Sequence, residues 1–168
     1  MVFSTAILGN YKNAEKLYIN AINSRRQTRD PIGEANTLNN LGEANSVVGT
    51  YQDRLGTYGT ALRLAKTAKD NGNQLRAIDG LVAAHSSVGR YNRAIELLEK
   101  RLTIASDLES PYEKLKSFES YAKIYEKLGK YSTARNFYER AITLARTLED
   151  SRKEVLLRDR VTQMMKKS

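Results

Sequence analysis

The chain contains no cysteine and no tryptophan, and its 168 residues include only two prolines and one histidine. Without cysteine it forms neither a disulfide nor a thiolate metal site, and this absence fits a reducing, cytoplasmic location. The one imidazole, that of His85, has no second histidine with which to share a metal ion. We therefore interpret His85 as a packed or half-buried side chain and expect no metal and no cofactor.

Long apolar runs are also missing. No stretch approaches the length needed to span a membrane, and the N-terminus shows no basic segment followed by an apolar one. We expect a cytoplasmic protein with no membrane association.

Acidic residues are fewer than basic ones, and the formal net charge is +9. A basic protein invites comparison with nucleic-acid binders. The excess lies at the two ends, however, with +3 over residues 1–30, zero over 31–114 and +6 over 115–168. Because it forms no continuous stripe, and many charges alternate at helical spacing, we regard nucleic acid as a disfavoured partner.

What the chain does have is a tripeptide, Gly-x-Tyr, that recurs four times at intervals of forty residues. The copies are Gly9-Asn10-Tyr11, Gly49-Thr50-Tyr51, Gly89-Arg90-Tyr91 and Gly129-Lys130-Tyr131. A fixed period of this length is typical of proteins built from stacked structural repeats.

Each tyrosine begins an amphipathic stretch in which small residues recur in register. In the fourth copy these are Ala134, Ala141 and Ala145. Steps of three, four and seven residues place them on one face of a helix, where their size lets a neighbouring helix approach closely. Two copies depart from the pattern, with Arg54 and Arg101 in small-residue positions.

A polar linker follows each of these helices, and a second amphipathic stretch then leads to the next Gly-x-Tyr. Glycine there can take the left-handed conformation that ends a helix, while Pro31 and Pro111 can open the helix after the linker. No alternating strand pattern occurs. We predict an all-α fold, a right-handed superhelical α-solenoid of antiparallel helix pairs, with a concave face lined by the helices that precede each glycine.

The period divides one domain, residues 1–168, into a partial repeat, three full repeats and a final helix that caps the stack. The boundaries are 1–33, 34–73, 74–113, 114–151 and 152–168. In the final helix we expect Val155, Val161 and Met165 to point inward.

Two stretches carry a family resemblance. They are Leu38-Asn39-Asn40-Leu41-Gly42 followed by Gly49-Thr50-Tyr51, and Leu128-Gly129-Lys130-Tyr131 followed by Ala134, Tyr138 and Ala141. The pattern resembles the tetratricopeptide repeat, in the longer forty-residue variant seen in kinesin light chains, Pins/LGN-type adaptors and bacterial signalling proteins. The resemblance covers nearly the whole chain.

In this family, ligands are contacted mainly by outward positions of the first helix of each repeat. The resemblance therefore implies a groove that binds a protein or peptide ligand. Carried to this sequence, the groove residues are Asn36, Asn39, Asn40, Glu43, Arg76, Asp79, Lys116, Glu119 and Lys123.

The N-terminal end suggests a second function. Phe3, Ile7 and Leu8 flank a face that no preceding full helix covers, and an open solenoid end normally needs a polar cap. This leaves open self-association into a homo-oligomer through that end.

Three functions are therefore compared: a non-catalytic scaffold that binds a peptide or protein segment in its groove, a self-association module, and a basic nucleic-acid-binding surface. The first is favoured because the repeat is present throughout. No catalytic residue is assigned, because no nucleophile, phosphate loop or complete acid–base set accompanies the carboxylates. We expect that the protein is not an enzyme.

Overall fold

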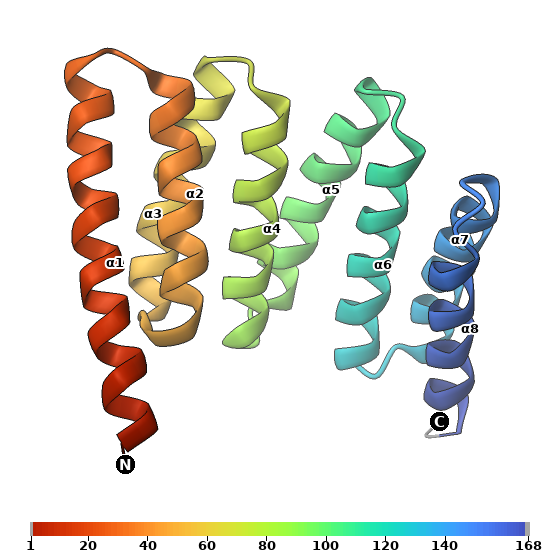
Figure 1. Cartoon of the computed structure of the whole chain (residues 1–168). Coiled ribbons are helices and arrows are strands. Elements are labelled where there is room, and N and C mark those ends of the chain that lie inside the picture. The colour runs from red at the N-terminus through yellow and green to blue at the C-terminus, as the bar shows by residue number, and fades with distance from the viewer. Residues whose placement is uncertain (1, 167–168) are drawn as a thin grey trace. The chain divides into compact units, whose positions relative to one another are not determined.

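The structure is a computed structural model that describes residues 2–166, with the side chains of residues 11–166. The described residues form eight α-helices and no strand, which confirms the all-α fold (Figure 1). The helices are α1 (Val2–Gln27), α2 (Pro31–Val48), α3 (Tyr51–Thr67), α4 (Asn71–Ser87), α5 (Tyr91–Asp107), α6 (Pro111–Lys127), α7 (Tyr131–Thr147) and α8 (Ser151–Met165).

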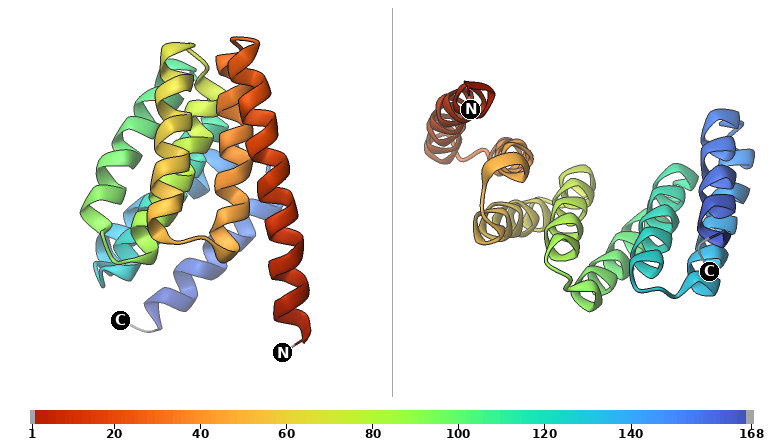
Figure 2. Two further views of the ribbon diagram at one scale, coloured as in Figure 1. Left: turned by 90° about the vertical axis from the view of Figure 1, so that its left-hand side faces the viewer. Right: turned by 90° about the horizontal axis from the view of Figure 1, so that it is seen from below.

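These helices group into two compact units, Met1–Gly89 with α1 to α4 and Arg90–Ser168 with α5 to α8. Within each unit, every helix packs against the next one in the chain. Short connections reverse the chain direction between them, as Figure 2 shows. The predicted antiparallel helix pairs are therefore confirmed in both units.

Local sequence signals account for most helix starts. Pro31 and Pro111 open α2 and α6, as expected. At α3 the Thr50 side chain accepts a hydrogen bond from the Asp53 amide, and Asp53 reaches back to the Thr50 amide, which forms a capping box. Arg90 and Lys130 precede α5 and α7 without a side-chain cap.

The glycine turns follow the prediction at two of four places. Gly89 and Gly129 have φ values of +74° and +71°, in the left-handed region that favours glycine. Gly49 instead has an extended backbone, with φ of −78°, because the Thr50 capping box already sets the direction of the chain. That expectation was wrong for Gly49.

The first predicted turn is absent. Helix α1 runs without interruption through Gly9 and Asn10, so Asn10 does not cap a helix that starts at Tyr11. Continuing the helix satisfies the backbone groups of Gly9 and Asn10 within the helix itself.

A periodic feature of the linkers was not predicted. One residue in each has a positive φ although it is not glycine, and these four residues are forty positions apart: Arg29, Lys69, Glu109 and Glu149. Each follows the end of a helix, where a left-handed residue lets the chain turn sharply. The linkers therefore repeat in conformation although their sequences differ.

The small residues act as predicted in both units. Ala61 and Ala65 in α3, and Ala134, Ala141 and Ala145 in α7, have no exposed surface. Their lack of bulk allows the neighbouring helices to pack at close range.

Close packing in the first unit centres on Tyr58 of α3. Its ring lies against Gly42 of α2 and Gly80 of α4, and a Cβ added at Gly42 would lie 2.6 Å from the ring. The two glycines therefore allow one tyrosine to fill the space between α2 and α4. This arrangement brings the polar faces of α2 and α4 within side-chain reach of each other.

Arg101, which departs from the small-residue pattern, is fully buried in the second unit. Its guanidinium forms a 2.7 Å ion pair with Glu113 and also donates to Ser117 Oγ at 2.8 Å and to the Glu113 carbonyl oxygen. The buried charge is thus paired and hydrogen-bonded, which is the condition under which such a group is tolerated.

The predicted inward face of α8 was wrong. Val155 and Met165 are exposed, and the buried residues are Leu157 and Met164. The helix packs on α7 through Leu157 and Met164. Of the expected face, Val161 is half-buried, and Val155 and Met165 are left at the surface. Among the described residues, no helix combines the length and the apolar character needed to cross a membrane.

Candidate functional site

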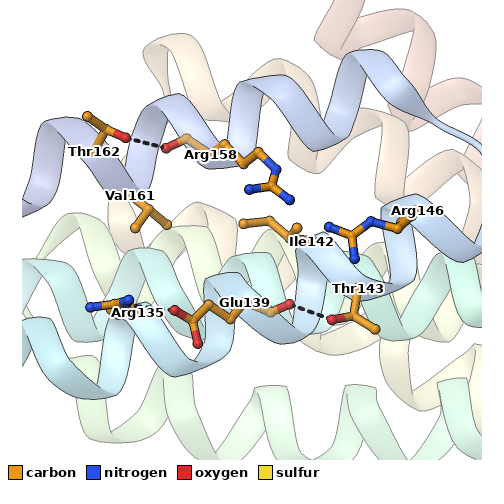
Figure 3. A pocket seen from close by; sticks show the side chains of 8 residues that line it. All are labelled: Arg135, Glu139, Ile142, Thr143, Arg146, Arg158, Val161 and Thr162. Carbon is orange, nitrogen blue, oxygen red and sulfur yellow. Dashed lines mark hydrogen bonds and ion pairs between the residues drawn. The ribbon is translucent and has the colours of Figure 1, made fainter.

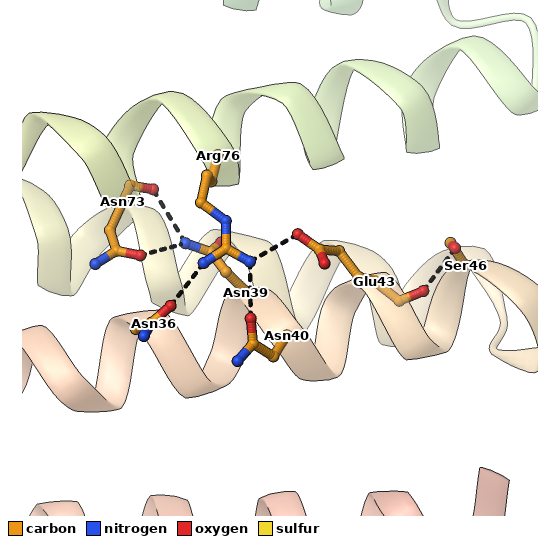
Figure 4. Close-up of polar contacts among 7 residues, drawn as sticks. All are labelled: Asn36, Asn39, Asn40, Glu43, Ser46, Asn73 and Arg76. Atoms are coloured by element: carbon orange, nitrogen blue, oxygen red, sulfur yellow. Dashed lines mark hydrogen bonds and ion pairs between the residues drawn. The ribbon is translucent and has the colours of Figure 1, made fainter. Parts of the chain in front are cut away.

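A cluster of polar side chains joins the exposed faces of α2 and α4 in the first unit, with Arg76 at its centre (Figure 4). From α4, Arg76 donates through Nη1 to Asn36 Oδ1 at 2.6 Å. Through Nη2 it donates to Asn40 Oδ1 and to Glu43 Oε1, both at 2.7 Å. The structure therefore brings together four residues predicted for the groove, here called the Arg76 cluster: Asn36, Asn40, Glu43 and Arg76.

The Arg76 cluster fixes the orientation of two amides. Guanidinium groups only donate hydrogen bonds, so Asn36 and Asn40 must turn their oxygen atoms towards Arg76. Their Nδ2 groups are then directed away from it, and within the described part of the chain neither Nδ2 donates a hydrogen bond. The exposed Asn36 and the half-buried Asn40 thus direct two amide donors, one helical turn apart on α2, away from Arg76.

Asn39 differs from its neighbours. It is fully buried, and its Nδ2 donates to the carbonyl oxygen and to Oδ1 of Asn73, at 3.2 and 3.0 Å. Its place beneath the surface keeps it from touching a ligand directly, which differs from its expected position in the groove. The pattern of outward positions failed here because α2 and α4 pack so closely that this position lies between them.

Charge in this region is mixed. Arg76 is the one cation of the predicted set on α2 and α4, and Glu43 and Asp79 are the two acids, so these residues carry a formal balance of −1. The Glu43 side chain is 62% exposed, whereas Asp79 is half-buried. Because Arg76 already pairs with Glu43, an acidic ligand group would have to displace that carboxylate to bind Arg76.

The remaining predicted groove residues lie on α6, in the second unit. Glu119 accepts hydrogen bonds from Lys123 at 2.7 Å and from Lys153 of α8 at 3.1 Å. Burial raises the pKa of the Glu119 carboxyl, but these two ammonium groups outweigh burial and hold the pKa below its ordinary value. Lys116 lies 3.7 Å from Glu113.

Lys153 is a site residue that the sequence analysis did not single out, because it lies in the stretch 152–168, which was expected only to cap the stack. Its contact with Glu119 spans 34 residues, the same spacing as the Asn39–Asn73 contact in the first unit. Glu119 and Lys153 occupy the same positions of the repeat as Asn39 and Asn73, two periods later in the chain. The forty-residue period could therefore have identified one contact from the other.

His85 is half-buried, and its Nδ1 lies 3.0 Å from the Tyr51 hydroxyl. The two rings meet edge to face, with centroids 5.7 Å apart. These contacts agree with its interpretation as a packed histidine.

The side chains of Phe3, Ile7 and Leu8, predicted for self-association, lie outside the described residues. That function stays a prediction.

A pocket of about 350 Å³ lies between α7 and α8 in the second unit (Figure 3). The sequence analysis did not single it out. The lining residues are Arg135, Glu139, Ile142, Thr143, Arg146, Arg158, Val161 and Thr162.

Comparison with known proteins supports the resemblance read from the repeats. Residues 75–147 match the model of the tetratricopeptide repeat family. The sequence matches none of the curated proteins with which it was compared.

Two solved structures are similar in fold. BtubC (BKLC) from P. vanneervenii has a TM-score of 0.77 and 17% identity, over 92% of this chain and 65% of that one. A Rap protein in complex with Competence and Sporulation Factor has a TM-score of 0.61 and 16% identity, over 94% of this chain and 48% of that one. The chain thus spans less than two thirds of the length of either protein, and at these identities the likeness shows the fold alone.

Proposed function

We propose that this chain, which has the fold of tetratricopeptide repeat proteins and matches the family over residues 75–147, is a non-catalytic, cytoplasmic scaffold that binds a segment of another protein on the polar faces of α2 and α4. One observation carries the proposal. Arg76 holds Asn36 and Asn40 by their Oδ1 atoms, so that both Nδ2 donors are turned away from it.

An extended peptide suits this arrangement. Its backbone offers carbonyl oxygens that are not engaged in secondary structure, and each can accept a hydrogen bond from an amide donor. Because the Asn36 and Asn40 side chains are already held in place, a peptide would bind without the entropic cost of ordering them. The asparagines of α2 would contact the peptide backbone, which is the same for every sequence, and so would contribute affinity. The charged side chains beside them would distinguish one peptide sequence from another.

Charge then favours one class of segment. With Glu43 largely exposed and Asp79 nearby, the faces of α2 and α4 would prefer a ligand with a basic residue beside its extended stretch. On α6, Lys116 and Lys123 against Glu119 give a balance of +1, which favours an acidic residue there. A protein segment that carries both basic and acidic residues would therefore suit the proposed groove residues. The groove residues of the first unit and those of the second unit would each bind their own part of it.

The Rap protein whose fold is similar was solved in complex with Competence and Sporulation Factor. That complex is a precedent for ligand binding by a protein of this fold, and it adds support to a scaffold function without identifying the partner here.

The test is a peptide-display selection on the purified protein, followed by calorimetric titration of the selected peptides. An Asn36→Ala/Asn40→Ala variant should bind about thirtyfold more weakly, because two hydrogen bonds of about 1 kcal/mol each are lost. The matched control is Asn92→Ala/Asn136→Ala, which removes two exposed asparagines from α5 and α7. Equal affinity of all three proteins for every selected peptide would exclude the α2 amides as the binding site.

A further inference from the structure

The pocket between α7 and α8 continues along one face of α8. Val155, Arg158, Thr162 and Met165 follow at steps of three and four residues, so they share that face. Val155 is 56% exposed and Met165 45% exposed, and both lie in line with the pocket residues Arg158 and Thr162. The pocket is therefore one part of a longer surface on α8 with an apolar residue at each end.

The equivalent face of α6 is packed against a neighbouring helix. Forty residues before Arg158, Val161 and Met165 stand Phe118, Tyr121 and Tyr125. All three contact one residue of α7, Phe137, whose ring lies 4.8 Å from Tyr121, 5.5 Å from Tyr125 and 6.2 Å from Phe118. On α6, this face is thus covered by a helix that inserts an aromatic ring.

Arg140 of α7 contributes a second contact to that packing. Its guanidinium lies 3.9 Å from the centre of the Phe118 ring, one turn beyond Phe137. On α8 the position of Phe118 is occupied by Arg158, so a cation at the Arg140 position of a docking helix would meet another cation. A carboxylate there would instead form an ion pair.

The lining of the pocket adds to this preference. Arg135, Arg146 and Arg158 contribute three guanidinium groups, and among the described residues these pair with two carboxylates. Arg135 pairs with Glu139, while Glu154 is shared between Arg146 and Arg158. One positive charge is therefore in excess around an apolar floor formed by Ile142 and Val161, which favours an acidic partner over a second copy of this basic chain.

We propose that the α7–α8 surface binds an amphipathic helix of a partner protein, through an aromatic residue against Val161 and an acidic residue three positions later against Arg158. The site is separate from the Arg76 cluster, which lies in the other unit, and does not depend on the function proposed there.

The experiment uses a probe taken from the chain itself. A fluorescent synthetic peptide with the sequence Tyr131–Thr147 carries glutamate in place of Arg140, and a second peptide keeps the arginine. Binding of both to the full chain is followed by fluorescence anisotropy. The protein variants are Arg158→Glu and, as the matched control, Arg63→Glu, which makes the same charge change on an exposed position of α3.

We expect saturable binding of the glutamate peptide to the unaltered protein and to Arg63→Glu. Arg158→Glu should weaken that binding about fivefold and should reverse the preference between the two peptides. Thermal unfolding would verify that Arg158→Glu is folded, as its 55% exposed side chain suggests.

Three outcomes would overturn the proposal. They are absence of saturable binding, equal binding of the glutamate peptide by Arg158→Glu and Arg63→Glu, and self-association of the unaltered chain that is abolished by Arg158→Glu. The last, measured by sedimentation equilibrium, would assign the surface to a second copy of this chain.

Discussion

Tyr58 and Gly42 are in such close contact that no other residue fits at position 42 without movement. A Cβ built on Gly42 would lie 2.6 Å from Cζ of the Tyr58 ring, which is closer than side-chain atoms approach one another in folded proteins. The contact holds α2 against α3 and sets the distance at which Arg76 of α4 reaches α2.

Gly42→Ala should therefore destabilise the first unit. Overpacking costs up to about 3 kcal/mol, while the better helix propensity of alanine returns about 1 kcal/mol. We expect a net loss of about 2 kcal/mol in the free energy of unfolding, measured by urea denaturation.

The same substitution in a Tyr58→Ala background provides the control, since the ring is then absent. If Gly42→Ala were equally destabilising in both backgrounds, the clash with Tyr58 would not be its cause.

Helix α3 contains two glycines that, unlike Gly42, have open space where a side chain would lie. Cβ atoms added at Gly56 or Gly59 would meet no atom within 4 Å, and both residues lie inside the helix. Replacing both with alanine should raise the free energy of unfolding by about 1 kcal/mol per site. Hydrogen exchange should also slow in α3, which the sequence predicts to be the least stable helix because of these glycines. Unchanged exchange there would refute that assignment.

The buried ion pair of Arg101 and Glu113 gives a third prediction. Arg101→Ala should cost about 3 kcal/mol, because it leaves a cavity and deprives Glu113 of its partner. Arg101→Met fills most of the volume without a charge, and buried pairs replaced by apolar residues are often neutral in stability. We therefore expect calorimetry to find the methionine variant clearly more stable than the alanine variant. Equal losses in the two variants would show that the charge, and not the volume, determines the effect.

Tyr58 also predicts the response to alkaline pH. Burial raises the pKa of its phenol from 10.0 to about 12, with Glu43 adding to the effect. The folded state thus holds the proton more tightly than the unfolded state. The stabilising contribution is complete below pH 10 and is lost as the pH rises from 10 to about 12.

Tyr58→Phe keeps the ring but has no ionisable hydroxyl, so its stability should fall less steeply in this interval than that of the unaltered protein. Tyr112→Phe, which changes an exposed tyrosine, serves as the control. Parallel curves for all three proteins in chemical unfolding between pH 9 and 12 would contradict the prediction.

Much of the fold was determined by the sequence alone. The forty-residue period of Gly-x-Tyr and the alanines three, ten and fourteen positions later predicted the helix pairs, because helical geometry converts those steps into one packed face. Pro31 and Pro111 marked helix starts through local backbone chemistry. The period also predicted which positions of α6 and α8 are equivalent. Because α7 covers one face of α6, this equivalence pointed to the corresponding face of α8 as a docking surface.

Other features depended on contacts between helices, which no local pattern specifies. Asn39 was expected at the surface, but the close approach of α2 and α4 around Tyr58 places it in the interior. Gly9 was expected to end a helix, but it lies inside the continuous helix α1. The orientation of the Asn36 and Asn40 amides depends on Arg76, forty and thirty-six residues away in the chain. The sequence thus determined which residues form helices and which faces are apolar, while tertiary packing decided which polar groups are buried, paired or available to a ligand.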